Sequence, residues 1–61
     1  MDSRIIALTP WQRVIYDLCW KVAASNDKIA GEELDRMKQE LPEEYEKAVE
    51  VWTDIMHEVM G

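Results

Sequence analysis

The chain has 61 residues, 13 of them acidic and 7 basic, which gives a formal net charge of −6 at pH 7. We expect one domain with a small core, and the hydrophobic content of 48% is ordinary for a folded protein. The acidic balance argues against direct nucleic-acid binding and against an anionic membrane surface. It is compatible with a basic protein partner, or with mimicry of the charge of a nucleic acid.

Residues 1–8 are expected to form a short N-terminal arm. The apolar run at 5–8 is too short for the core of a signal peptide, and Asp2 stands where such a peptide carries positive charge. No stretch approaches the roughly 20 apolar residues of a membrane span. Cys19 is the single cysteine, so no internal disulfide can form, and we expect a reducing, cytoplasmic setting.

A first helix is predicted over residues 9–24. Thr9 suits the N-cap because its hydroxyl can accept from an early backbone N–H, and Pro10 suits the first turn. Gln12 stands three positions after Thr9, as in a capping box. Helical projection gives one apolar stripe that we expect to face the core, with Cys19 at its edge. The stripe consists of Trp11, Val14, Ile15, Leu18 and Val22.

The opposite side of this helix carries two aromatic residues, Tyr16 and Trp20, beside an expected ionic ladder of Arg13, Asp17 and Lys21. Two interpretations of Trp20 are open. Either the arm or the last helix covers it, or Trp20 and Tyr16 belong to an interface. We favour the interface, because Trp, Tyr and Arg are enriched at binding hot spots.

Residues 25–27 have turn chemistry, and a short second helix is predicted over 31–40. Glu32 and Arg36 are spaced for a favourable ion pair on its surface. The residue before Pro42 avoids the helical region, which ends this helix. Its single apolar stripe is Leu34, Met37 and Leu41.

A third helix is predicted over residues 42–60, with Pro42, Glu43 and Glu44 in a first turn where the helix dipole favours negative charge. Its apolar arc covers about half of the helix circumference, which is more than one neighbour needs. We expect the surplus to meet a second copy or another protein. The arc contains Tyr45, Ala48, Val49, Trp52, Ile55, Met56 and Val59, with Val51 and Met60 at its edges.

These elements predict an all-α fold, a three-helix protein over residues 1–61 in which the two longer helices pack antiparallel with the short helix between them. We also expect a homodimer, because a chain this small usually needs a further source of stability.

No constellation of nucleophile, base and orienting group is visible, and His57 is the single histidine, so we expect no enzyme, no cofactor and no metal site. The expected function is a small regulator or inhibitor that binds a larger protein. Phages and mobile elements use such proteins against host factors, for example a transcription regulator, a motor ATPase or a defence complex. The candidate partner-binding residues are Arg13, Tyr16, Trp20, Val51, Met56 and Met60.

The alternative is a nucleic-acid mimic. Its acidic face on the third helix would occupy the basic groove of a nucleic-acid-binding protein. The residues of that face are Glu43, Glu46, Glu50 and Asp54.

Overall fold

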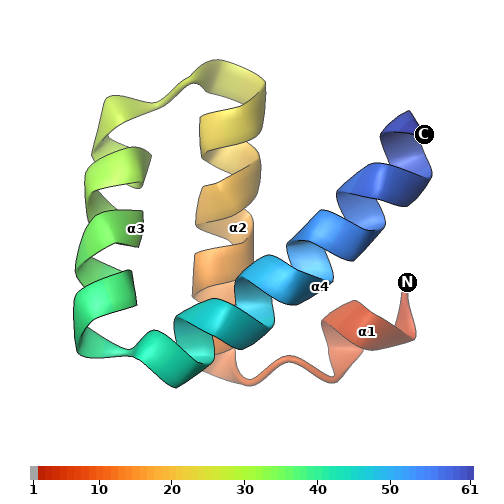
Figure 1. Ribbon diagram of the computed structural model, residues 1–61, viewed down its shortest axis with the longest axis horizontal. Helices are drawn as coiled ribbons and strands as arrows, with labels where there is room; N and C mark the ends of the chain where they lie inside the picture. Colours follow the sequence, from red (N-terminus) through yellow and green to blue (C-terminus); the bar gives the residue numbers. More distant parts are fainter. Residues whose placement is uncertain (1) are drawn as a thin grey trace.

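The computed structural model describes residues 2–61, which form four helices in close succession (Figure 1). Helix α1 spans Ser3–Ile6, α2 Pro10–Ser25, α3 Lys28–Glu40 and α4 Pro42–Met60. The all-helical class is confirmed for this part of the chain. The expected arm contains a helical turn, α1, so the described residues hold one helix more than predicted. Met1, the first residue of that arm, lies outside the described residues.

The start of α2 confirms the predicted capping box. Thr9 Oγ1 accepts from the Gln12 backbone N–H at 3.3 Å, and Gln12 Oε1 accepts from the Thr9 N–H at 3.0 Å. The Thr9 hydroxyl also donates to Glu44 Oε2 at 3.0 Å. One side chain therefore caps α2 and ties its first turn to the first turn of α4.

The start of α3 lies three residues earlier than predicted, at Lys28. Asn26 takes the left-handed backbone conformation, with φ 51° and ψ 43°. Asp27 Oδ1 then accepts from the backbone N–H groups of Ile29 and Ala30 at 2.9 and 3.1 Å. An aspartate N-cap directly after a left-handed residue starts the next helix at once, so the turn is shorter than its composition suggested.

The helices are arranged differently from the predicted pairing. α2 and α3 run side by side in opposite directions, and α4 crosses α2 obliquely before its C-terminal end extends away from both (Figure 1). The chain turns back after α2 and again after α3, which returns α4 to the general direction of α2. The predicted antiparallel packing of the two longer helices is therefore wrong. The antiparallel partner of α2 is α3.

The core lies where α2, α3 and α4 meet. Ile15 and Ala48 have no exposed surface, and Cys19 and Met37 are buried beside them. The small Ala48 side chain lets α4 approach α2 closely at their crossing. Partly buried side chains surround this cluster: Leu34, Leu41, Tyr45, Val49 and Trp52.

The buried face of α2 is rotated away from the predicted stripe. Its buried residues are Ile15, Tyr16 and Cys19, whereas Trp11 and Val14 are 54% and 43% exposed. At about 100° per residue this face centres near Cys19, which the projection had placed at the edge. The physical reason is that α3 and α4 cover α2 from two adjacent sides, and neither side coincides with the widest apolar stripe.

Helix α1 is linked to the C-terminal part of α4, near which it lies in Figure 1. Arg4 Nη2 forms ion pairs with Asp2, at 2.6 Å, and with Glu58 of α4. Asp2 also caps α1 by accepting from the Arg4 backbone N–H at 2.8 Å. These hydrogen bonds from Arg4 lower the pKa of Asp2 to about 2.

Candidate protein-binding surface

Trp20, which the sequence predicted to be an interface residue, packs against two other aromatic rings. Its ring lies edge-on to Tyr16, with centroids 6.4 Å apart, and to Trp52 of α4, with centroids 5.8 Å apart. T-shaped aromatic pairs contribute about 0.5–1.5 kcal/mol beyond the area that they bury. The three rings therefore stabilise the crossing of α2 and α4. Of the two interpretations left open, coverage by the last helix matches this geometry.

The six predicted partner-binding residues differ widely in access. Tyr16 and Val51 are buried, at 6% and 5% exposed, so the expectation that they face solvent in a single chain is wrong. Trp20 and Met56 are half-buried, and Met60 is mostly exposed near the end of α4. Arg13 is exposed, with its Nε 3.4 Å from Asp17 Oδ1, which is the first of the two pairs in the predicted ladder. The structure brings Tyr16 and Trp20 into ring contact. A binding role for the accessible members stays a prediction.

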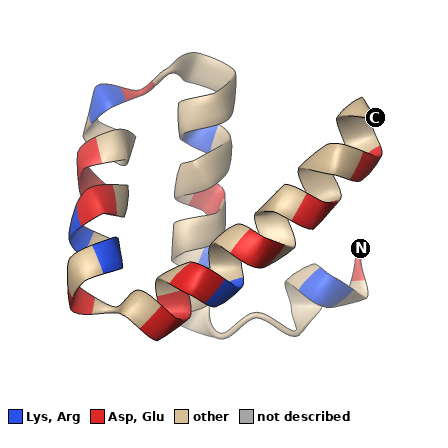
Figure 2. Cartoon of the chain, in the orientation of Figure 1, with Lys and Arg blue, Asp and Glu red and all other residues tan. Residues whose placement is uncertain are grey.

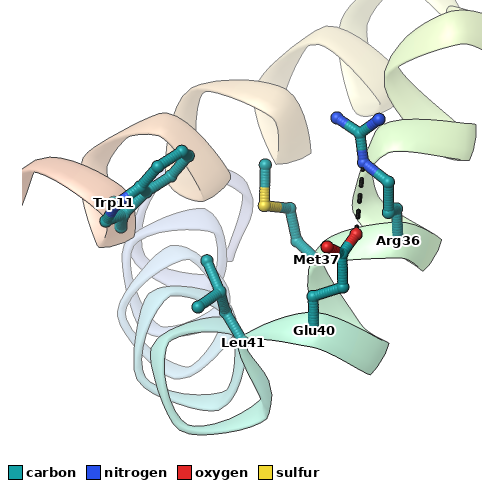
Figure 3. A pocket seen from close by; sticks show the side chains of 5 residues that line it. All are labelled: Trp11, Arg36, Met37, Glu40 and Leu41. Atoms are coloured by element: carbon teal, nitrogen blue, oxygen red, sulfur yellow. Dashed lines mark ion pairs between the residues drawn. The ribbon is translucent and has the colours of Figure 1, made fainter.

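The tryptophan that lies open to solvent is Trp11. It lines a hollow of about 520 Å³ between the first turn of α2 and the end of α3 (Figure 3). Met37 and Leu41 lie between the Trp11 ring on one side and Arg36 with Glu40 on the other. The hollow thus has an apolar floor, one aromatic wall and one charged wall.

The local sequence explains how this hollow is built. The capping box at Thr9 fixes the first turn of α2, which carries Trp11. The last turn of α3 supplies Met37 and Glu40, and Leu41 follows at the junction with α4. Because the two segments come from different helices, no local pattern in the sequence indicates the hollow. We define the Trp11 face as Trp11, Val14, Met37 and Leu41.

The charged wall is held by ion pairs within α3. Arg36 Nε lies 3.5 Å from Glu40 Oε2, and Arg36 also pairs with Glu33. The pairing of Arg36 with Glu32, which the spacing predicted, is replaced by these two contacts. Such exposed pairs add little to stability, about 0.2–1 kcal/mol each. Their consequence here is that the positive charge of Arg36 is already matched by carboxylates.

A second hollow continues from the first and is acidic. It shares Glu40 and Leu41 with the first, and its other lining residues are Pro42, Glu43 and Glu44. We call Glu40, Glu43 and Glu44 the acidic ledge. Arg36 is the one cation that lines either of these two hollows in the described part of the chain. The border of the Trp11 face is therefore negatively charged overall.

The predicted acidic face of α4 is exposed along its whole length. Glu43, Glu46, Glu50 and Asp54 are all open to solvent and make up an acidic band. Red segments recur along α4 in Figure 2. A helix rises about 1.5 Å per residue, so neighbouring carboxylates of this band are about 4.5–6 Å apart along the axis. The band can meet a positively charged groove, but exposure alone does not distinguish that role from solvation.

A smaller apolar hollow of about 210 Å³ lies over the core, with Cys19 and Trp52 among its lining residues. Burial raises the pKa of the Cys19 thiol to about 11, because desolvation disfavours the thiolate. At neutral pH the thiol is protonated and a poor nucleophile. The indole Nε1 of Trp52 is buried without a hydrogen-bond partner. The remaining lining residues are Val22, Ala23, Leu34, Tyr45 and Val49.

Within residues 2–61, the structure groups no three His, Cys, Asp or Glu side chains in a way that could hold a metal ion. Over the same residues, every helix is too short or too polar to cross a membrane. Comparison with protein families, with curated proteins and with solved structures found no match to this chain. The geometry of the surface therefore carries the functional argument.

Proposed function

We propose that this protein is a small regulator or inhibitor that acts by binding a larger protein through the Trp11 face. The observation that carries this proposal is the 54% exposure of Trp11 beside a hollow with an apolar floor. An exposed Trp with an adjacent recess is the kind of anchor that dominates binding energy at protein interfaces. The other two tryptophans contact each other across α2 and α4.

The area still exposed on Trp11 is energetically significant. A Trp side chain buries about 150–250 Å² when fully covered, so roughly half of that is available to a partner. At about 25 cal/mol per Å² this is about 2–3 kcal/mol from one residue. Val14, which is 43% exposed and one turn further along α2, extends the same apolar area. The two side chains together supply a compact centre for an interface.

The mode of action that we propose needs no chemistry by this protein. A docked chain of this size blocks a surface that the partner uses for something else, or holds the partner in one conformation. Phage and mobile-element antagonists of host factors act in this way, and a transcription regulator, a motor ATPase or a defence complex would be a suitable target. The proposal includes a cytoplasmic setting, because Cys19 is a single free thiol.

The test of this function is affinity capture from lysate of the source cell. It compares two variants, each of which truncates one exposed apolar side chain to alanine. Trp11→Ala removes the anchor, and Ile29→Ala removes a comparably exposed apolar side chain from α3, where Ile29 is 72% exposed. We expect a partner to be retained by the wild type and by Ile29→Ala, and lost with Trp11→Ala. Equal capture by all three proteins would contradict the Trp11 face.

A second candidate function is supported by the exposed acidic band of α4. In this reading the protein mimics a nucleic acid and occupies a basic groove. Charge reversal at Glu46, Glu50 and Asp54 abolishes binding of such a partner and leaves binding through the Trp11 face intact. Trp11→Ala has the opposite effect. The two functions are thereby separated in one experiment.

We also propose that two copies associate through the exposed end of α4, where Val59 and Met60 are 72% and 79% exposed. Sedimentation over a dilution series tests this, with Met60→Glu as the disrupting variant. If the wild type is a monomer at tens of micromolar concentration, the dimer proposal is wrong and the proposal for the Trp11 face is unaffected.

A further inference from the structure

The chemistry around the Trp11 face selects one kind of partner, and this inference rests on the proposed function. The floor of the hollow, Met37 and Leu41, is apolar and its open side is bordered by Trp11. A large apolar side chain can therefore enter and contact all three residues. Such a knob contributes affinity, but it does not distinguish one partner from another.

Discrimination comes from the acidic ledge. Glu40 belongs to both hollows, so the carboxylates begin at the wall of the apolar recess itself. Arg36, the one cation that lines either hollow in the described part of the chain, is already paired with Glu33 and Glu40. Glu44 accepts from the Thr9 hydroxyl, which is an uncharged donor. Three carboxylates line the two hollows against one cation, so a partner seated there meets net negative charge on its flank.

We infer that the Trp11 face binds a basic segment of a different protein, in which a large apolar side chain enters the hollow while neighbouring Lys or Arg residues pair with the acidic ledge. A second copy of this chain is a poor occupant. In a two-fold symmetric contact the same patch meets itself, which would bring the two acidic ledges together.

The probes are three synthetic amphipathic helices of about 14 residues with one identical leucine face. Their polar positions are lysine in the first, glutamine in the second and glutamate in the third. Binding is measured by calorimetry at low salt. We expect the lysine peptide to bind the wild type about tenfold more tightly than the glutamine peptide, which corresponds to two or three exposed ion pairs. The glutamate peptide binds most weakly.

Three variants locate the effect. Trp11→Ala weakens the binding of the lysine and glutamine peptides alike, by about 30–150-fold, which corresponds to the 2–3 kcal/mol that burial of the exposed Trp11 surface supplies. Glu40→Gln combined with Glu43→Gln removes the advantage of lysine over glutamine and leaves the glutamine peptide unchanged. The matched control is Glu50→Gln combined with Asp54→Asn, which removes the same amount of charge further along α4. It preserves most of the advantage. Circular dichroism verifies that each variant is folded.

The outcomes separate this inference from the proposed function. If the lysine and glutamine peptides bind equally and both depend on Trp11, the basic partner is excluded while the docking face stands. If the α4 control removes the preference for the lysine peptide as fully as the ledge variant does, that preference comes only from the net charge of the protein, and the inference is wrong. If Trp11→Ala affects no peptide, the docking face fails as well. If Trp11→Ala instead abolishes self-association in sedimentation, the occupant is a second copy.

Discussion

Trp11 and Trp20 lie nine positions apart on one helix and have opposite environments. Trp20 contacts the rings of Tyr16 and Trp52, so its position contributes to the crossing of α2 and α4. Trp11 lies in the first turn, 54% exposed, beside a hollow that the end of α3 leaves open. The sequence predicted the reverse, with Trp11 in the core and Trp20 facing outward.

The difference shows that neighbours decide which face of a helix is buried. Projection finds the densest apolar stripe of α2, and this stripe does exist. The helix is nevertheless covered from two directions, by α3 alongside and by α4 across it. Their joint footprint centres on Cys19, and the part of the stripe at Trp11 and Val14 lies outside it. The uncovered part is available to a partner.

The largest expected effect is the loss of folding stability when Trp20 is replaced. Trp20→Ala removes both edge-to-face contacts and opens a cavity between α2 and α4, which costs about 3 kcal/mol of unfolding free energy. Urea unfolding followed by circular dichroism measures this loss. Trp20→Phe keeps an aromatic ring at the site and loses about 1 kcal/mol. A Trp20→Ala protein as stable as the wild type would show that the three rings are not a structural unit.

Cys19, at the centre of the buried face, gives the next largest effect. Its thiol has a pKa of about 11 when folded, against 9.0 for the ordinary thiol. A raised pKa in the folded state means that stability is fully present below pH 9 and is lost as pH rises towards 11. We expect the unfolding free energy to fall by about 1–2 kcal/mol over this pH range. This is less than the energy of two full pKa units, because Cys19 borders an open hollow where solvent screens the charge.

The measurement for Cys19 compares the unfolding free energy at pH 8 and pH 11 in the wild type and in Cys19→Ala. Lys and Tyr residues titrate in both proteins, so their contribution cancels in the difference. The variant is less stable at both pH values but loses less between them. An equal alkaline loss in the two proteins would contradict the burial of the thiol.

Thr9, at the Trp11 end of α2, has a smaller structural effect. Thr9→Ala removes the N-cap and the hydrogen bond to Glu44, and costs about 1 kcal/mol. Thr9→Ser retains the hydroxyl and serves as the matched control. Thermal denaturation of the wild type and the two variants measures this loss. If Thr9→Ala unfolds at the same temperature as Thr9→Ser, the cap is not formed.

Features that depend on a few adjacent residues were predicted correctly. The capping box at Thr9, the span 42–60 of the last helix and the apolar stripe of α3 are all set by local spacing. The early start of α3 was missed because Asp27 was interpreted as a turn residue, although it also has the chemistry of an N-cap. That signal was present in the sequence.

Features that depend on how helices cross were not predictable in the same way. Val51 was expected at the edge of an apolar arc, but only 5% of it is exposed in the folded chain. The hollow at Trp11 requires α2 and the end of α3 to meet, and Leu41 is 30 positions from Trp11 in the chain. Periodicity describes one helix at a time and contains no information on such long-range contacts.

The smallest expected effect on folding is at Trp11, and it completes the comparison. Trp11→Phe changes the unfolding free energy by less than about 0.5 kcal/mol, because the side chain lies mostly outside the packed core. The same substitution has a large effect on how strongly acrylamide quenches the tryptophan fluorescence. The remaining emission comes from Trp20 and Trp52, which pack against each other, so acrylamide quenches it less than that of the wild type. Trp20→Phe keeps the accessible fluorophore and is quenched more strongly. Equal quenching of the two variants would show that Trp11 is covered in solution, and the docking surface would then have to be sought elsewhere on the protein.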